Sequence, residues 1–438
     1  MQLQTDRKQI LYICSFIAAI VISIFVFPEG IVGVALAILS SFLVLHFIKR
    51  DEDASFLQQV FLVALLGRGV FAAIIFYFGA YSYFGGDATT YSDSAIALLR
   101  AFNGHSIDNN FAIKALGMEG SGWGMSWFVA FIYFFTGRNI FATMAVECVI
   151  GAATALLIYK IVIEIFNNQR AARLAAGLVA FFPAMIIWSS QALKDGLIVF
   201  LLVLMMYSVI RLQTRYSFLF TALLISSLLA ILSLRFYIFY MAAIAVTGSF
   251  LIGTSNSLSE VIRRSILFSV IGAALLYVGA IRSASTEFEK YGNLEAIQRS
   301  REDLSRAGSG FGQDLNVSTT EGALVALPIG LTYLMLAPFP WEANSLRQAL
   351  VVPESIVWWC LLPFMVIGLW YTIKNRLRSA IAILIFAFML TMAYSLFQGN
   401  IGTAYRQRTQ IQVFLFIFIA VGIVIQREKA ENRRMLKR

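Results

Sequence analysis

The sequence is poor in the residues that build metal centres and disulfide-stapled folds. It contains three cysteines and two histidines in 438 residues. Cys14, Cys148 and Cys360 all lie within apolar runs, which argues against a disulfide framework or a cysteine-based metal site. His46 and His105 are too few for a histidine-based zinc site. Small disulfide-rich folds and zinc enzymes are therefore not expected.

Charge is also scarce, and hydrophobic residues take its place. Only 13% of the residues are charged, 59% are hydrophobic, and the mean hydropathy is +0.78. A soluble protein of this length needs far more polar surface. Apolar runs of about 17–22 residues recur from end to end, and each is long enough to cross the roughly 30 Å core of a bilayer. The composition predicts an all-α polytopic membrane protein.

The apolar runs predict about twelve full spans. They lie at about 10–27, 31–48, 58–80, 139–159, 171–188, 196–212, 216–233, 236–254, 264–282, 354–373, 379–397 and 409–426. Two shorter apolar pieces lie at about 123–136 and 325–341. The second contains Pro328, Pro338 and Pro340, which suit a broken or re-entrant helix.

Basic residues in the short loops predict the orientation. Clusters of lysine and arginine occur at 7–8, 49–50, 160–173, 211–215, 263–264, 374–378 and 427–438. The positive-inside rule places all of them in the cytoplasm, provided that the two short pieces do not cross. Both termini are then cytoplasmic. The net charge of +10 is a consequence of topology, and no nucleic-acid-binding motif accompanies it.

Two long segments are predicted on the extracytoplasmic side. In the first, 81–122, the stretch from Tyr91 to Leu99 is amphipathic and is expected to lie near the membrane interface. The second, 283–324, has mixed charges and small polar residues, so it is either a lid over a site or a solvated connector. Without an internal repeat or a separate soluble domain, residues 1–438 are expected to form a single membrane domain.

Acidic candidates stand at the extracytoplasmic ends of predicted spans. Asp87 follows two glycines, which allow a sharp turn and close approach of a substrate. Its carboxylate suits a general base, a ligand of Mg²⁺ or Mn²⁺, or a helix N-cap. Asp195 begins a span, and Lys194 beside it either contacts a phosphate or extends to the lipid headgroups. Asp93 is a weaker candidate that is expected on a solvated face.

Three arginines are predicted on the same side. Arg235 begins a span among aromatic residues and is either an interfacial anchor or an anion ligand. Arg406 and Arg408 follow Tyr405 at the start of the last span. Basic residues at this end of an inward-running span oppose the positive-inside tendency, and an anionic headgroup or phosphate would favour them.

Two further charged residues, Arg68 and Glu147, lie inside apolar runs. An unpaired charge within a membrane is costly. We therefore expect the two side chains to form a buried ion pair.

Four stretches carry a resemblance to a known superfamily. They are GGDATTYSDSAIALL, GWGMSWFVAFIYFFTGRNIFATMAV, AARLAAGLVAFFPAMIIWSSQALKDGLIVFLLVL and YRQRTQIQVFLFIFIAVG. In order and spacing they resemble the GT-C superfamily of polyprenyl-phosphate-dependent membrane glycosyltransferases, in the branch of protein mannosyltransferases and aminoarabinose lipid A transferases. The resemblance implies a catalytic carboxylate at Asp87, a second-loop aspartate at Asp195 and a basic residue near the lipid phosphate at Arg406 or Arg408. The family's usual Asp-Glu pair is Asp87-Ala88 here, which leaves the metal requirement open.

The first hypothesis is an inverting glycosyltransferase of a bacterial inner membrane. It moves a sugar from a polyprenyl-phosphate donor to a glycan, lipid or protein acceptor, with Asp87 as base. Arg406 and Arg408 neutralise the departing phosphate, and Asp195 and Lys194 position acceptor or phosphate.

Two alternatives remain. One is a polysaccharide polymerase or ligase of the O-antigen type, in which Arg235, Arg406 and Arg408 hold a lipid pyrophosphate. The other is a lipid or glycan transporter, although the sequence lacks the inverted repeat and paired interrupted helices of many transporters.

Overall fold

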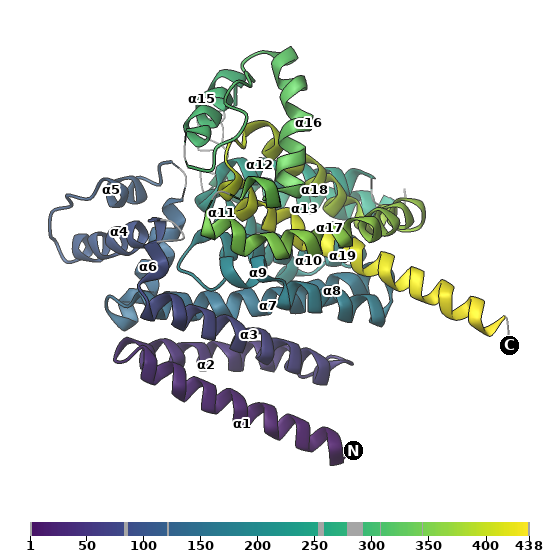
Figure 1. The fold of residues 1–438 in the computed structure, drawn as a ribbon, viewed down its shortest axis with the longest axis horizontal. Helices are drawn as coiled ribbons and strands as arrows, with labels where there is room; N and C mark the ends of the chain where they lie inside the picture. The colour runs from purple at the N-terminus through teal and green to yellow at the C-terminus, as the bar shows by residue number, and fades with distance from the viewer. Residues whose placement is uncertain are drawn as a thin grey trace. The chain divides into compact units, whose positions relative to one another are not determined.

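The computed structural model describes residues 2–82, 86–120, 122–252, 258–277, 292–306, 308–343 and 345–436. Over these ranges the chain is α-helical, with two short 3-10 turns and no β-strand (Figure 1). The all-α class predicted from composition is confirmed. Residues 283–291 of the second long loop lie outside the described ranges.

The helices follow the predicted apolar runs in order. They are α1 (Gln2–Phe25), α2 (Glu29–Ile48), α3 (Ala54–Tyr77), α4 (Asp87–Phe102), α5 (Asn110–Leu116), α6 (Trp123–Thr136), α7 (Ile140–Phe166), α8 (Gln169–Phe181), α9 (Pro183–Trp188), α10 (Lys194–Thr214), α11 (Phe218–Leu234), α12 (Phe236–Ile252), α13 (Leu258–Tyr277), α15 (Leu294–Ser305), α16 (Thr320–Leu336), α17 (Leu346–Asn375), α18 (Leu377–Phe397) and α19 (Ile401–Met435). The 3-10 turns are η1 (Ala80–Ser82) and η2 (Pro340–Glu342).

Seven of the described helices are long and apolar enough to cross a membrane. They are α2, α3, α7, α10, α17, α18 and α19. Shorter apolar helices occur in α1, α6, α11, α12 and α16. The polytopic membrane architecture is therefore confirmed, whereas the count of about twelve full spans stays a prediction.

Proline decides where one predicted span breaks. The run at 171–188 forms two helices, α8 and α9, because Pro183 occupies the first position of α9 and has no N–H to continue α8. Pro328, by contrast, lies within a continuous α16, which ends at Leu336 before Pro338. The re-entrant character of this segment stays a prediction.

The chain divides into two compact units. Unit 1 comprises Met1–Tyr159, Ala176–Val203 and Ser233–Arg235, and unit 2 comprises Lys160–Ala175, Leu204–Leu232 and Phe236–Arg438. In unit 1, α1 packs against α2 and α3, and α4 packs against α5 and α6 (Figure 1). In unit 2, α17 lies along α19, while α18 packs against α12 and α16.

Close packing of α17 on α19 depends on two glycines. A Cβ atom added at Gly368 would lie 1.8 Å from the Phe418 carbonyl oxygen, and one at Gly422 would lie 2.0 Å from that of Phe364. Only glycine allows the two backbones to approach so closely. This contact holds in place the helix that carries Arg406 and Arg408.

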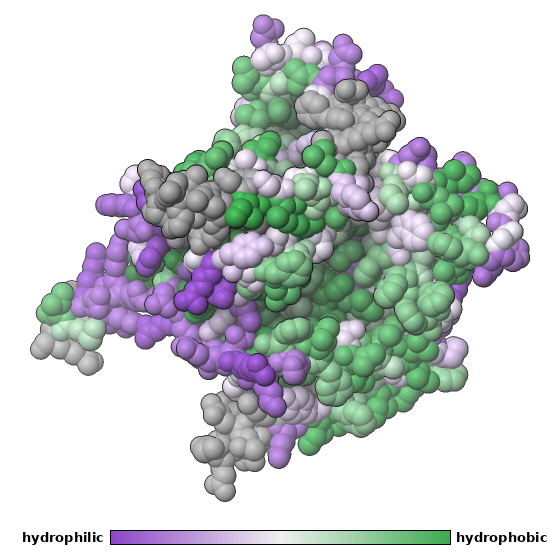
Figure 2. Space-filling view, turned by 180° about the vertical axis from the view of Figure 1, so that it is seen from behind, coloured by the Kyte–Doolittle hydropathy of each residue, from purple (hydrophilic) through white to green (hydrophobic). Residues whose placement is uncertain are grey.

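Many large apolar side chains are exposed, and Figure 2 shows a broad hydrophobic region on the visible face, bordered on one side by hydrophilic residues. Phe134, Phe135, Leu251 and Leu324 are all exposed. Exposed apolar area on this scale is expected where hydrocarbon replaces water as the solvent. The surface therefore agrees with an integral membrane protein.

Candidate functional site

Asp87 is the first residue of α4 and is half-buried. The N-cap position belongs to Gly86, and no side-chain hydrogen bond caps the helix. The alternative in which Asp87 is the N-cap is therefore wrong. At the first helical position its negative charge interacts favourably with the helix dipole.

The helix that begins at Asp87 carries a second polar residue towards α10. Gly122, just before α6, has φ of +92°, and a Cβ atom there would lie 3.2 Å from Lys194 Nζ and 3.4 Å from the Tyr91 hydroxyl. Lys194 therefore lies close to Tyr91, which is one helical turn after Asp87. Tyr91 was not a candidate in the sequence, although its spacing from Asp87 was the available signal.

Asp195 and Arg235 form a buried ion pair within unit 1. Arg235 Nη2 donates to Asp195 Oδ1 at 2.9 Å, and the two side chains are 6% and 0% exposed. The pair joins the first turn of α10 to the junction between α11 and α12. Since removing one partner of such a pair leaves a buried charge uncompensated, the pair stabilises this corner of the unit.

Asp93 has a simpler environment. Its Oδ1 accepts a hydrogen bond from Arg138 Nη2 at 2.6 Å, and both side chains are more than half exposed. Solvent-exposed pairs of this kind contribute at most about 1 kcal/mol. The expectation of a solvated face residue agrees with this position.

The predicted ion pair between Arg68 and Glu147 is wrong. Arg68 donates to Ser189 Oγ at 2.8 Å and to the Ala180 carbonyl at 2.8 Å. Glu147 is fully buried, and neither of its carboxylate oxygens has a hydrogen-bond partner among the described residues. The break at Pro183 exposes carbonyl groups at the end of α8, and these acceptors hold Arg68 instead.

In unit 2, Arg408 is fully buried in α19. Its Nη1 donates to the carbonyls of Met335 and Ala337, at 3.2 and 2.9 Å, where α16 ends. Its Nε and Nη2 have no hydrogen-bond partner among the described residues. These two nitrogens form the edge that binds a carboxylate or phosphate in a bidentate manner.

Two aromatic rings hold the Arg408 guanidinium. Its Cζ lies 5.3 Å from the ring centre of Tyr405 and 5.8 Å from that of Trp358. The Tyr405 hydroxyl donates to Glu354 Oε2 at 2.6 Å. Glu354, which was not a candidate in the sequence, thus belongs to the same buried cluster.

Arg406 differs from Arg408 in its surroundings, because it is only half-buried. Two residues along a helix correspond to about 200° of rotation, so the two side chains leave α19 on nearly opposite faces. Both lie inside α19, which begins at Ile401, eight residues before the predicted start of the span. Asn400 caps this helix by accepting a hydrogen bond from the Thr403 amide.

The described part of the second long loop is attached to unit 2 beside this cap. Arg301 of α15 donates to the carbonyls of Gln398 and Leu396, at 2.6 and 3.2 Å, where α18 ends. The Phe311 amide donates to the Gly399 carbonyl at 2.8 Å. Burial lowers the pKa of Arg301 from its ordinary value. This part of the loop is therefore a packed segment, which the solvated-connector reading did not anticipate.

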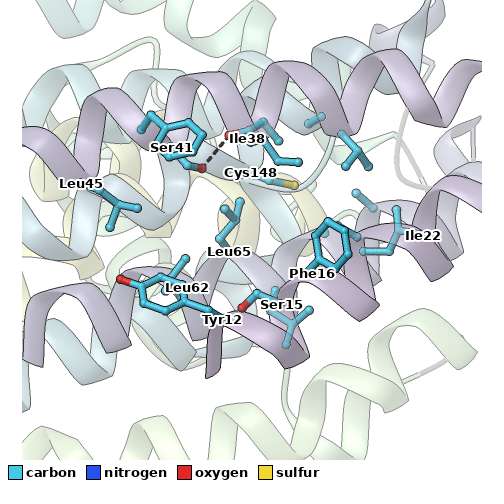
Figure 3. Close-up of a pocket in the computed structure, with 18 of the residues that line it drawn as sticks. Tyr12, Ser15, Phe16, Ile22, Ile38, Ser41, Leu45, Leu62, Leu65 and Cys148 are labelled. Carbon is cyan, nitrogen blue, oxygen red and sulfur yellow. Dashed lines mark hydrogen bonds between the residues drawn. The ribbon is translucent and has the colours of Figure 1, made fainter. Parts of the chain in front are cut away.

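Two cavities are lined almost entirely by apolar side chains. One, of about 280 Å³, lies in unit 1 between α1, α2, α3 and α7, and includes Phe16, Leu65 and Cys148 (Figure 3). The other, of about 790 Å³, lies in unit 2 between α16, α17, α18 and α19. Neither cavity is lined by the acidic or basic candidates, so neither defines the site of polar chemistry.

A metal site is not evident from the donor atoms. In the described ranges, no group of three or more His, Cys, Asp or Glu side chains is arranged to hold a metal ion. Asp195, one of the three aspartate candidates, directs Oδ1 to Arg235. The divalent cation, Mg²⁺ or Mn²⁺, stays a prediction without an assigned site.

Residues 122–281 match the sequence model of the family described as dolichyl-phosphate-mannose-protein mannosyltransferase. No curated protein gives a significant sequence match. This segment is therefore similar to a family of membrane glycosyltransferases, in agreement with the GT-C resemblance seen in the sequence. The matched residues include Lys194, Asp195 and Arg235.

Two solved structures from Archaeoglobus fulgidus are also similar. The archaeal oligosaccharyltransferase AglB, in complex with an inhibitory peptide and a dolichol-phosphate, has a TM-score of 0.42 and 14% identity, over 72% of this chain and 43% of that chain. The apo oligosaccharyltransferase has a TM-score of 0.43 and 14% identity, over 72% and 44%. The chain matches less than half the length of these proteins.

Proposed function

We propose that this protein transfers a sugar from a polyprenyl-phosphate donor to a hydroxyl group of a glycan, lipid or protein acceptor. The observation that carries the proposal is the position of Asp87 in the first turn of α4, one turn before Tyr91, which in turn lies close to Lys194. We further propose that the reaction takes place on the extracytoplasmic side of a bacterial inner membrane, with both termini in the cytoplasm. The distribution of basic residues supports this orientation.

In the proposed reaction, the acceptor oxygen attacks the anomeric carbon of the donor sugar. The new C–O bond forms as the bond between that carbon and the phosphate oxygen breaks. The electron pair leaves with the polyprenyl phosphate, and the proton of the acceptor hydroxyl passes to the Asp87 carboxylate. Attack from the face opposite the leaving group inverts the configuration of the sugar.

Arginine and lysine side chains supply the positive charge that the leaving group needs. The bidentate edge of Arg408 suits a phosphate, and Arg406 adds a second cation on the same helix. Preorganised cations stabilise charge that develops in the transition state. Lys194 contributes to positioning near Tyr91, whereas Asp195 acts through its pair with Arg235.

The test compares Asp87→Asn with Asp93→Asn in cells that express the full chain. Lipid-linked sugars and the acceptor glycan are measured by mass spectrometry. Asp87→Asn is expected to lower transfer about 100-fold or more, because the general base is lost, so polyprenyl-phosphate monosaccharide accumulates. Asp93→Asn, which changes a solvated carboxylate on the same helix, is expected to behave as wild type.

Other outcomes point elsewhere. Full transfer by Asp87→Asn would remove this residue from the mechanism. Accumulation of pyrophosphate-linked oligosaccharides would favour a polymerase or ligase. Unchanged lipid pools with normal expression would favour a transporter.

A further inference from the structure

Glu354 is a buried acid in α17. It follows Pro353 in α17 and is 7% exposed. Trp358, one turn later on the same helix, donates its indole N–H to the Met335 carbonyl at 2.8 Å. Met335 also accepts from Arg408. Glu354 therefore belongs to the structure that surrounds the Arg408 guanidinium.

Tyr405 connects the acid to the arginine. Its hydroxyl donates to Glu354 Oε2, and its ring lies beneath the Arg408 guanidinium. All three side chains are buried, so water screens their charges little. The carboxylate offsets part of the positive charge that Arg408 presents, although the two groups do not touch through a hydrogen bond.

The charge of this cluster has a consequence for the donor. Arg408 presents one positive charge, and the carboxylate of Glu354, which accepts from the Tyr405 hydroxyl, opposes it with negative charge. A lipid diphosphate carries more negative charge than the monophosphate of the same lipid.

We propose that Glu354 is a specificity-determining residue that makes the arginine site selective for lipids with one phosphate group over lipids with a pyrophosphate group. The inference rests on the proposed function, in which Arg408 binds the lipid phosphate. A second phosphate brought to this site meets a buried carboxylate, and juxtaposed like charges in such surroundings are strongly unfavourable. The bidentate edge of Arg408 then serves the single phosphate.

Unit 2 offers a matched control for this residue. The Tyr333 hydroxyl donates to Glu342 Oε1 at 3.2 Å, which makes a second tyrosine–glutamate hydrogen bond in this unit. Neither Tyr333 nor Glu342 is among the residues that contact the Arg408 guanidinium. Glu342 is only half-buried and is better screened by solvent than Glu354. Glu342→Gln removes the same charge from the same kind of pair.

The experiment measures binding of farnesyl phosphate and farnesyl diphosphate to the full chain in nanodiscs. Wild type is expected to bind the monophosphate about tenfold more tightly than the diphosphate. Glu354→Gln is expected to lose this preference, while Glu342→Gln keeps it. Size-exclusion chromatography and thermal unfolding check that each variant is folded.

Arg408→Gln separates this inference from the proposed function. If Arg408→Gln binds both lipids as wild type does, the phosphate role of Arg408 is wrong. If Arg408→Gln loses binding but Glu354→Gln retains the wild-type preference, only the role of Glu354 is overturned. A wild-type preference for the diphosphate also overturns it.

Tyr405→Phe provides a second variant if Glu354→Gln does not fold. It keeps the aromatic ring and the carboxylate but removes the hydrogen bond that holds them together. We expect a reduced preference for the monophosphate, because the carboxylate is no longer fixed beside the guanidinium. An unchanged preference in this variant would count against the proposal.

Discussion

Two buried arginines, one in each unit, are satisfied in different ways. Arg235 in unit 1 directs its guanidinium to the carboxylate of Asp195. Arg408 in unit 2 uses one nitrogen for the carbonyls at the end of α16, and its bidentate edge has no partner among the described residues. The Asp195 carboxylate neutralises Arg235 through a direct contact, whereas the carbonyl groups hold Arg408 in place without adding a counter-charge. The comparison distinguishes a structural arginine from one suited to an anionic ligand.

The strongest test of this comparison removes one partner of the pair in unit 1. Asp195→Asn is expected to lower the free energy of unfolding by about 3–5 kcal/mol, because Arg235 is left buried without its counter-charge. Thermal and chemical unfolding in detergent measure the change. The double variant Asp195→Leu with Arg235→Leu is expected to recover much of the loss. If Asp195→Asn is as stable as wild type while transfer is lost, Asp195 has a direct role in the reaction.

A smaller effect is expected for a conservative change in unit 2. Arg408→Lys keeps the charge but lacks the bidentate edge. We expect affinity for farnesyl phosphate to fall by about 1.5–3 kcal/mol, the usual contribution of a hydrogen bond to a charged group. Titration of the lipid against the folded protein measures this. Equal affinity in Arg408→Lys would mean that charge alone, without the fork geometry, holds the phosphate.

The smallest effect is expected at an exposed ion pair. Arg138→Gln breaks the contact with Asp93 and is expected to change the free energy of unfolding by less than about 1 kcal/mol, because water screens both groups. Unfolding at low and high salt provides the measurement. If Arg138→Gln lowers the free energy of unfolding as much as Asp195→Asn does, exposure to solvent does not explain the difference between the exposed pair and the buried pair.

The sequence was sufficient to predict which segments are helices and that they belong to a membrane protein. Apolar runs such as 58–80 and 379–397 coincide with α3 and α18, because hydrocarbon burial acts on each segment separately. The break at Pro183 also follows from a local property, the missing amide hydrogen. The positions of Asp87, Asp195, Arg406 and Arg408 at or near helix starts were likewise visible.

The sequence did not reveal which charged groups meet. It predicted a pair between Arg68 and Glu147, but Arg68 binds Ser189 and the carbonyls of α8. It treated Asp195 and Arg235 as separate candidates, but their side chains are in contact although they are 40 residues apart in the sequence. Several acceptors of equal chemistry compete for each arginine, and only the packing of helices selects among them.

The sequence by itself therefore determined the local features of the protein, namely the apolar helices, their breaks and a few polar residues near helix ends. Each depends on the properties of one short segment in its solvent. The tertiary structure decided that Glu354 lies beside Tyr405, that Tyr91 approaches Lys194, and that Nε and Nη2 of the buried Arg408 have no hydrogen-bond partner among the described residues. These facts depend on distances between segments far apart in the chain, which no local pattern encodes.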